Sequence, residues 1–253
     1  QTGWPHICIP TAYAGSEMTP ILGETRDGQK TTRSDPTILP GTVIYDVELT
    51  MGLPMRISVT SVINAIAHAV EALYARDTNP VIFLLGAEGV KALASSLPTI
   101  VDYPSNIPER QSAMYGASLC ATCLGRVGMS LRHKLCHTLG GSFKMPHSET
   151  HTIIMPHVFA YNVPQIPKVM KKLAEVLPGS DCDAVRGLNA LLGKLRVNRA
   201  LKDYGMKEDD IDQAAEIAAS NPYWNPCVFG KGDIRELLRR AWVGEEARAD
   251  LQS

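Results

Sequence analysis

Residues 132–147 read RHKLCHTLGGSFKMPH and hold three histidines, His133, His137 and His147, in one short stretch. An α-helix has about 3.6 residues per turn, so His133 and His137 would lie on one face, one turn apart. Gly140-Gly141 is expected to end this helix, and the Met-Pro that follows is expected to lead into a new helix opened by His147. The chain would thereby return the third imidazole towards the first two.

A second histidine segment lies upstream, where residues 64–71 read NAIAHAVE. Its polar residues Asn64, His68 and Glu71 stand at positions i, i+4 and i+7, which is again one face of a helix. We therefore expect four of the seven histidines to come from two short segments that converge. The hypothesis is a functional site in which His68 and the three later imidazoles surround a common hollow.

Two kinds of chemistry are open to such a cluster. Imidazoles from separate helices, together with a carboxylate, would bind a divalent metal such as zinc or iron. One turn before His68, however, stands Asn64, an uncharged amide that should lower the affinity for a dication. Clustered imidazoles can instead transfer protons or polarise an anionic substrate near neutral pH. The remaining histidines have no paired acid or imidazole at site spacing and are interpreted as core or surface groups: His6, His151 and His157.

The composition is that of an ordinary globular protein, with 45% hydrophobic and 20% charged residues. A net charge of −1 without basic runs argues against a nucleic-acid partner, and no uninterrupted apolar run approaches the ~20 residues of a membrane span. The six cysteines suggest no disulfide framework, and the CxxC from Cys120 to Cys123 has no second pair to complete a zinc site. We expect buried thiols in a reducing, cytoplasmic protein.

The chain divides into a strand-like segment, 1–54, and a helical domain, 55–253. In the first, Asp27-Gly28 is a turn signal that predicts a hairpin between Ile21–Thr25 and Lys30–Thr32. Further strand candidates lie at 7–10 and 42–46. These pieces are too few to bury a sheet by themselves. Beyond them, apolar residues at helical spacing predict a mainly α fold with helices over 58–76, 80–101, 109–125, 130–139, 148–162, 167–177, 183–195, 198–204, 208–219 and 231–243.

Two loops also carry candidate contacts. The small-residue loop Thr11–Glu17 could bind a phosphate or ribose through its hydroxyls and free amides, or be an ordinary loop. The aromatic loop Asn221–Pro226 could roof a pocket with Tyr223 and Trp224, or simply be anchored by buried rings.

Seven motifs together resemble one known family: PTAYAGSE, KTTRSDP, YDVELT, NAIAHAVEALYA, HKLCHTLGGSF, PHSETH and NPYWNP. They occur in order along essentially the whole chain and resemble the maleylacetate reductases of the iron-containing alcohol dehydrogenase superfamily. The resemblance implies a helical domain of dehydroquinate synthase-like type, preceded by the last strands of a nucleotide-binding domain. It also implies NAD(P)H-dependent reduction of maleylacetate, a small dicarboxylate, to 3-oxoadipate in aromatic degradation.

The resemblance assigns roles residue by residue. The superfamily's metal ligands, an Asp and three His, correspond here to Asn64, His68, His133 and His147, and the Asn is typical of the maleylacetate reductase branch, which implies no required metal. His137 would handle substrate and proton. The catalytic candidates are thus His133, His137, His147 and Lys134, which would hold the dicarboxylate and stabilise an enolate. Substrate-binding candidates are His68, Asn64, Tyr13, Tyr223 and Trp224, and cofactor-binding candidates are Thr11, Gly15 and Ser16.

The sequence also departs from the family pattern. It contains no G-x-G-x-x-G or G-G-G-S run, and Ala12 replaces the usual second threonine of the PTAYAGSE motif. Segment 1–54 is therefore interpreted as the remnant of a truncated nucleotide-binding domain, and this chain alone is expected to bind a dinucleotide poorly. Two alternatives stay open. One is cofactor-free dehydration, isomerisation or cyclisation by the histidines; the other is a non-catalytic dimerising module that pairs through segment 1–54. The chain could assemble as a homodimer.

Overall fold

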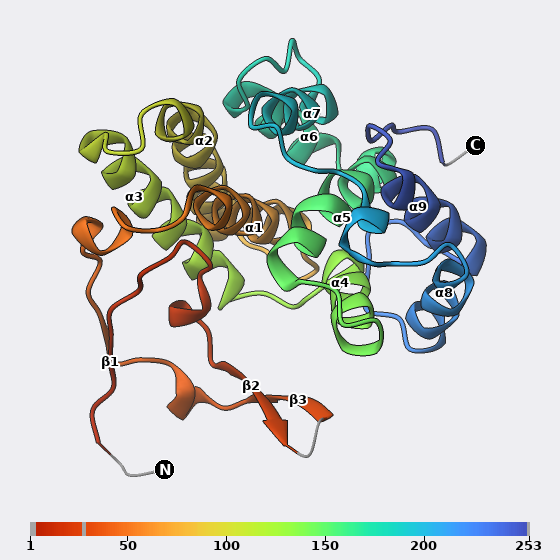
Figure 1. The fold of residues 1–253 in the computed structure, drawn as a ribbon, viewed down its shortest axis with the longest axis horizontal. Coiled ribbons are helices and arrows are strands. Elements are labelled where there is room, and N and C mark those ends of the chain that lie inside the picture. The colour runs from red at the N-terminus through yellow and green to blue at the C-terminus, as the bar shows by residue number, and fades with distance from the viewer. Residues whose placement is uncertain (1–3, 27–28, 252–253) are drawn as a thin grey trace.

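A computed structural model describes residues 4–26 and 29–251. It is mainly α-helical, as predicted, with a small strand-containing segment at the N-terminal end (Figure 1). Its α-helices are α1 (Met55–Tyr74), α2 (Pro80–Asp102), α3 (Ile107–Leu124), α4 (Leu131–Ser142), α5 (His147–Asn162), α6 (Pro167–Val176), α7 (Ala184–Lys194), α8 (Asp210–Ser220) and α9 (Lys231–Val243).

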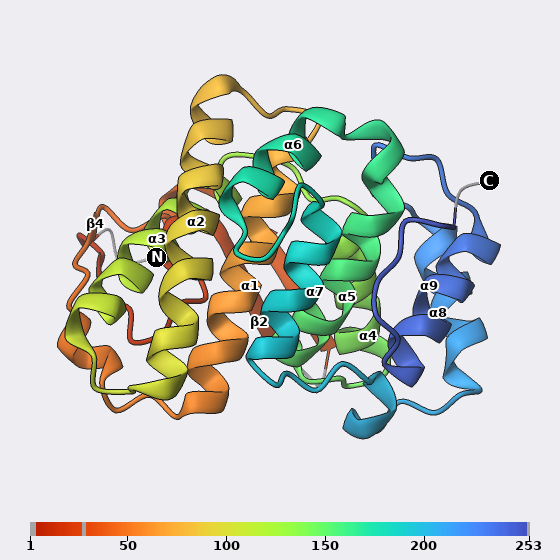
Figure 2. The same ribbon diagram turned by 90° about the horizontal axis from the view of Figure 1, so that it is seen from above.

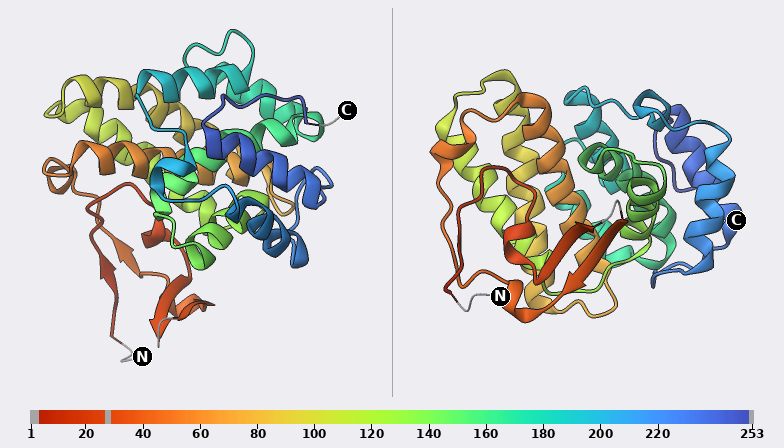
Figure 3. Two further views of the ribbon diagram at one scale, coloured as in Figure 1. Left: turned by 45° about the vertical axis from the view of Figure 1, so that its right-hand side comes forward. Right: turned by 60° about the horizontal axis from the view of Figure 1, so that its bottom comes forward.

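The N-terminal segment contains two small sheets. Strand β1 (Ile7–Cys8) pairs in parallel with β4 (Thr42–Val43), and β2 (Ile21–Arg26) pairs antiparallel with β3 (Gln29–Ser34). The second pair confirms the predicted hairpin, although its turn at Asp27-Gly28 lies outside the described residues. Figure 3 shows the hairpin lying beneath the helices, against the side where α4 and α5 meet.

Helix α1 is the centre of the fold. Its residues from Ser58 to Tyr74 are all buried, because α2, α3 and α5 pack around it (Figure 2). By length and composition alone, α1 and α2 are each apolar enough to cross a membrane, which the sequence analysis did not expect. In the structure, 94% of the apolar window of α1 and 50% of that of α2 are buried inside the protein. The apolar face of α1 therefore belongs to the core.

Helices α2 and α3 pack closely through small residues. A Cβ atom added to Gly89 would lie 3.0 Å from the carbonyl oxygen of Gly116 and 2.7 Å from Cys120 Sγ. Side chains at these positions would push the two backbones apart. The small-residue composition of α3 thus fixes the distance between these helices and, through them, the position of α1.

Helix α5 joins two hydrophobic cores. Met155, Phe159 and Ala160 pack in a core that contains α1, α2, α3, α6 and α7. Ile154 and Val158, on its other side, pack with α4, α8 and α9. Segments from both halves therefore meet along α5, and α1 and α4 approach each other at this seam.

Two predicted helix boundaries were wrong. Gly140 and Gly141 do not end the helix; they lie inside α4, which continues to Ser142. The turn occurs instead around Lys144, whose φ is +56°. Glycine is tolerated in a helix at a cost of about 1 kcal/mol, and burial of the preceding residues of α4 outweighs that cost. The helix predicted at 198–204 is reduced to a short 3₁₀ turn, Leu201–Tyr204.

Candidate functional site

A cavity of about 320 Å³ opens where α1, α4 and the start of α5 meet the N-terminal segment. Five imidazoles line it together with Asn64 and Ser16: His68, His133, His137, His147 and His151. The central hypothesis of the sequence analysis, that four named imidazoles share one hollow, thus agrees with the arrangement in the structure. The cavity lies at the seam between the two cores, and polar side chains of α1, α4 and α5 line it.

The rings contact one another closely. His68 from α1 stacks on His133 from α4, with centroids 5.3 Å apart and ring planes 6° from parallel. The His133 and His137 centroids are 5.8 Å apart, and those of His147 and His151 are 4.3 Å apart. His151 also meets His68 edge-on at 5.9 Å. The cluster is therefore continuous from α1 through α4 to α5.

His151 was interpreted from the sequence as a core or surface group, and the structure corrects this by placing it inside the cluster. The spacing contained the signal, because His151 follows His147 by four residues, as His137 follows His133. The other two histidines interpreted this way do lie outside the cavity. His6 is exposed, and His157 is buried, where burial and the nearby Arg240 lower its pKa to about 4.

Glu71 and Arg132 form a buried ion pair beneath His133. Arg132 Nη2 lies 2.7 Å from Glu71 Oε2, and the two side chains are 1% and 2% exposed. The same carboxylate oxygen lies 2.6 Å from His133 Nδ1, and the backbone N–H of Ser130 donates to the other oxygen at 2.6 Å. Burial alone would raise the pKa of Glu71, but His133 and Arg132 together outweigh it and lower that pKa to about 2. Glu71 is therefore a carboxylate at neutral pH.

Three of the imidazoles are held neutral. Burial lowers the pKa of His68, His133 and His151, and the Arg132 guanidinium lowers each of them further. A carboxylate can only accept a hydrogen bond, so Nδ1 of His133 carries the ring hydrogen and Nε2 is its basic nitrogen. A guanidinium can only donate, so Nδ1 of His151, which faces Arg132 Nη1, accepts and its Nε2 carries the hydrogen. The ion pair thus fixes two tautomers.

Three residues that line the cavity each carry a buried polar atom that makes no hydrogen bond to another described residue. Within the described residues, buried Asn64 Oδ1, His68 Nδ1 and His151 Nε2 have no hydrogen bond. At least about 90% of buried polar groups in proteins are bonded, so unpaired ones at a cavity indicate that a ligand or water completes them. With one acceptor, one neutral N–H and an imidazole nitrogen on offer, the cavity suits a polar molecule with both carbonyl and hydroxyl or carboxylate groups.

Tyr223 and Lys134 lie next to the cavity residue His137 without lining the cavity themselves, and we call this pair the rim. The Tyr223 ring lies edge-on to His137, with centroids 6.3 Å apart, and Lys134 Nζ lies 5.6 Å from the Tyr223 centroid. The loop that carries Tyr223 is held by Asn225. Its side chain exchanges two hydrogen bonds with Asn162 on α5, at 2.6 and 3.0 Å. Tyr223 is therefore held beside His137, and the roofing interpretation of this loop stays a prediction.

The N-terminal candidates separate into two groups. Ser16 lines the cavity, and Gly15 before it has a φ of +89°; a Cβ added to Gly15 would lie 3.1 Å from that of Ala121 on α3. Thr11 is exposed and does not line the cavity. Tyr13, a substrate-binding candidate, is 1% exposed in the core, where its hydroxyl accepts from Arg110 at 3.3 Å. Its assignment to substrate is corrected, because an apolar ring buried under α3 is unavailable to a ligand in the cavity.

Known proteins share the part of the chain that forms this cavity. The family model for the C-terminal domain of Fe-containing alcohol dehydrogenases matches residues 58–242, which include all five cavity histidines. The chain belongs to the iron-containing alcohol dehydrogenase family. Within that family it is 49% identical, over 244 residues, to maleylacetate reductase of Rhizobium sp. strain MTP-10005, covering 96% of this chain and 69% of the relative. It is 50% identical to maleylacetate reductase of Pseudomonas sp. strain P51, covering 95% of this chain and 68% of the relative.

Solved structures of the family share the fold. The crystal structure of maleylacetate reductase from Agrobacterium tumefaciens superposes with a TM-score of 0.92 at 50% identity, covering 97% of this chain and 69% of that one. A 1,3-propanediol oxidoreductase superposes with a TM-score of 0.86 at 27% identity, covering 94% and 66%. The resemblance seen in the motifs is thus confirmed, and the chain spans 66–69% of the length of these relatives.

The family name implies iron, and the donor set here fits that ion poorly. Among residues 4–26 and 29–251, no group of three or more His, Cys, Asp or Glu side chains is placed to hold a metal. Asn64 offers an amide oxygen without charge. The Arg132 guanidinium, a permanent cation, lies 3.1 and 3.2 Å from the two ring nitrogens of His133. A dication among these side chains would meet that positive charge, so no step below depends on a metal.

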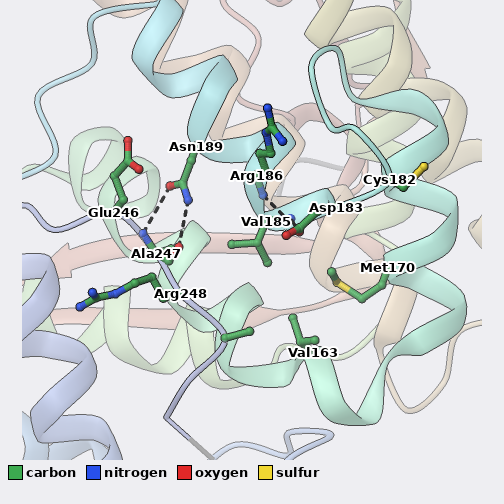
Figure 4. A pocket seen from close by; sticks show the side chains of 11 residues that line it. Val163, Met170, Cys182, Asp183, Val185, Arg186, Asn189, Glu246, Ala247 and Arg248 are labelled. Carbon is green, nitrogen blue, oxygen red and sulfur yellow. Dashed lines mark hydrogen bonds between the residues drawn. The ribbon is translucent and has the colours of Figure 1, made fainter.

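Two further hollows of this family member are poor candidates for the chemistry. Trp224 does not line the histidine cavity but lines an apolar groove with Tyr74 and Phe83, so its assignment to the substrate is corrected as well. The hollow in Figure 4, of about 640 Å³, lies between α7 and the C-terminal segment. Its charged side chains are already paired, Arg186 with Asp181 at 2.7 Å and Arg248 with Glu245 at 2.8 Å. The sequence analysis did not select Arg132 as a site residue, although it directly precedes His133 in the chain.

Proposed function

We propose that this chain acts as a maleylacetate reductase, with NAD(P)H reducing the carbon–carbon double bond of maleylacetate to give 3-oxoadipate. The single observation that carries the proposal is the histidine cavity itself, on a chain 49–50% identical to enzymes of that name. The pocket volume of about 320 Å³ suits a small dicarboxylate. The proposed cofactor would supply a hydride when bound. Ser16, which lines the cavity, would adjoin it, and Thr11 and Gly15 would contact it only through the backbone of the same loop.

The chain's own residues would handle the charge that the reduction creates. When a hydride adds to the carbon β to the ketone, the electron pair of the double bond forms a new bond from the α carbon to the carbonyl carbon, and the carbonyl π pair moves to the ketone oxygen, giving an enolate. Neutral donors aimed at that oxygen stabilise it without reorganisation. His151, whose Nε2–H is unpaired and buried, is such a donor. Lys134 at the rim would attract the carboxylates.

The reduction is complete when the α carbon takes a proton. His137 would supply this proton, since it lines the cavity between His133 and Tyr223 and is only half-buried, in reach of solvent protons. Fixing of the His133 tautomer by Glu71 makes that ring a constant part of the wall rather than a competing proton donor. His147, at the exposed start of α5, would close the substrate's other side.

The test is a coupled measurement on the 253-residue chain. Purified protein is mixed with NADH or NADPH and maleylacetate, and oxidation of the nucleotide is followed together with formation of 3-oxoadipate. Equal amounts of oxidised nucleotide and 3-oxoadipate are expected, at nucleotide concentrations raised to offset the poor dinucleotide binding expected of this chain. His137→Asn should lower kcat by about 10²–10⁴-fold, whereas His6→Asn, at an exposed position outside the cavity, should not.

Other outcomes of this experiment identify the alternatives. Consumption of maleylacetate without nucleotide oxidation would favour a cofactor-free reaction and contradict the reductase. Binding of maleylacetate without any conversion, in calorimetry, would favour a binding module. We also propose a cytoplasmic protein that forms a homodimer; sedimentation of the purified chain tests the second point. Support for pairing comes from the exposed apolar side chains of the N-terminal segment, Ile7, Ile9 and Ile44.

A further inference from the structure

We propose that Arg132 is the resident cation of the histidine cavity, held by Glu71 against His133 and His151, and that it excludes a metal dication from these side chains. This role is independent of the reaction proposed above. It explains why a site with this many imidazoles fits a metal poorly, and it names a residue in addition to Asn64 as the cause.

The guanidinium is fixed on every side. Its Nε lies 2.8 Å and its Nη2 lies 2.7 Å from Oε2 of Glu71. Nη2 lies 3.1 Å from Nδ1 and 3.2 Å from Nε2 of His133, and Nη1 contacts Nδ1 of His151. The planar group therefore connects α1, α4 and α5 at the seam between the two cores. No rotamer change is open to a side chain that is 1% exposed and bonded at each nitrogen.

The contacts also occupy two ring nitrogens that a metal could use, Nδ1 of His133 and Nδ1 of His151. A metal binds the lone pair of a neutral imidazole. His133 Nδ1 carries a hydrogen towards Glu71, and its Nε2 lies beside Nη2 of Arg132. His151 Nδ1 is occupied by Nη1 of the same arginine. Arginine stays charged at any ordinary pH, so a dication would be repelled by a neighbour that cannot lose its proton.

Asn64 alone offers a competing explanation, since its amide replaces a charged oxygen ligand. A cross of variants separates the two causes. Asn64→Asp adds the carboxylate while leaving the guanidinium, Arg132→Gln removes the guanidinium, and the double variant does both. Co²⁺ is the probe, because its visible absorption reports imidazole and carboxylate coordination directly; metal content after dialysis is measured in parallel.

We expect the wild-type chain and Asn64→Asp to bind Co²⁺ weakly and without a coordination spectrum. The double variant should bind one Co²⁺ at least about tenfold more tightly than Asn64→Asp. The proposal is overturned if Asn64→Asp alone binds Co²⁺ as tightly as the double variant, because Asn64 would then be the whole cause. A merely structural role for Arg132 predicts weaker binding in the double variant, not tighter.

Loss of Arg132 leaves Glu71 as an unpaired buried charge, so a second route guards against a variant that does not fold. Glu71→Gln with Arg132→Gln removes both charges together, and in the Asn64→Asp background it should still bind Co²⁺ at least about tenfold more tightly than Asn64→Asp. Arg132→Lys in that background keeps a cation and should not gain binding; a gain there would also contradict the proposal. Arg248→Gln, on the surface, is the matched control.

Discussion

His133 Nδ1 lies 2.6 Å from Glu71 Oε2, although the two residues are 62 positions apart in the chain. The contact joins α4 to α1 across the seam between the two hydrophobic cores. Because Glu71 is 2% exposed, the carboxylate exists there only with the charge of Arg132 and several donors around it. This contact makes the position of one cavity ring depend on an ion pair behind it, and stability and chemistry therefore share the same side chains.

Glu71→Gln should destabilise the fold by about 3–5 kcal/mol, because it leaves the buried guanidinium of Arg132 without a counter-charge. Urea unfolding followed by circular dichroism measures the change. Asp212→Asn is the matched control, since Asp212 pairs with Arg235 at 2.6 Å but both side chains are more than half exposed. That variant should unfold like the wild type. Equal effects of the two substitutions would contradict the picture of a buried, charge-dependent pair.

Stability should fall as the pH drops below about 6.5, because buried histidines are neutral in the folded state. His68, His133, His151 and His157 have lowered pKa values in the folded state, so below the ordinary histidine pKa the unfolded chain binds more protons. Each such histidine lowers the free energy of unfolding by up to about 1.4 kcal/mol per pH unit. For His157 this loss continues down to its folded pKa of about 4. The Glu71 contribution follows at lower pH, lost as pH falls from about 4.3 towards its folded pKa of about 2.

The measurement is the free energy of unfolding at a series of pH values. His157→Gln removes one of these groups from a place outside the cavity, so its unfolding free energy should depend less steeply on pH between about 6.5 and 4. His6→Gln, at an exposed position, should leave the slope unchanged. A wild-type curve that is flat over this interval would show that the buried imidazoles are not held neutral.

Much of the fold could be read from the sequence because its signals are local. The hairpin β2–β3 follows from Asp27-Gly28 between short strands, and the helical face of Asn64, His68 and Glu71 follows from their spacing alone. The residue that neutralises Glu71, by contrast, could not be predicted from local sequence. Its ion pair with Arg132 joins residues 61 apart, and only the packing of α1 against α4 brings them together. Hydrophobic periodicity and secondary-structure propensity describe local sequence, so neither predicts a contact between two helices.

Errors at the site had the same origin. Tyr13 was a substrate-binding candidate by resemblance to the family, yet its hydroxyl accepts a hydrogen bond from Arg110 in the core. His151 was left out because no acid accompanies it in sequence, while in space it faces Arg132. Both corrections depend on cations that lie far away along the chain. A residue's neighbours in sequence thus indicate its secondary structure better than they indicate its surroundings.

Asn225→Ala should weaken substrate binding more than turnover. The side chain of Asn225 holds the rim loop to Asn162 and also donates to the Cys227 carbonyl at 2.8 Å, so its loss frees Tyr223 from its place beside His137. Each lost bond costs about 1 kcal/mol. Steady-state kinetics should show KM raised by about tenfold, with kcat changed less, and proteolysis should cleave the loop faster. Asn221→Ala, on an exposed neighbour, is the control; a fall in kcat alone would contradict a rim role.

Gly141→Ala should stabilise the protein by about 0.5–1 kcal/mol, which is the opposite of what a helix-ending glycine would show. Gly141 lies inside α4, and an added Cβ would meet nothing within 4 Å, so alanine removes backbone freedom from the unfolded chain without a clash. Gly15→Ala is the contrasting variant. Its φ of +89° and a Cβ only 3.1 Å from that of Ala121 predict a loss of about 1–3 kcal/mol. Thermal unfolding measures both, and a destabilised Gly141→Ala would mean that α4 ends where the glycine pair begins.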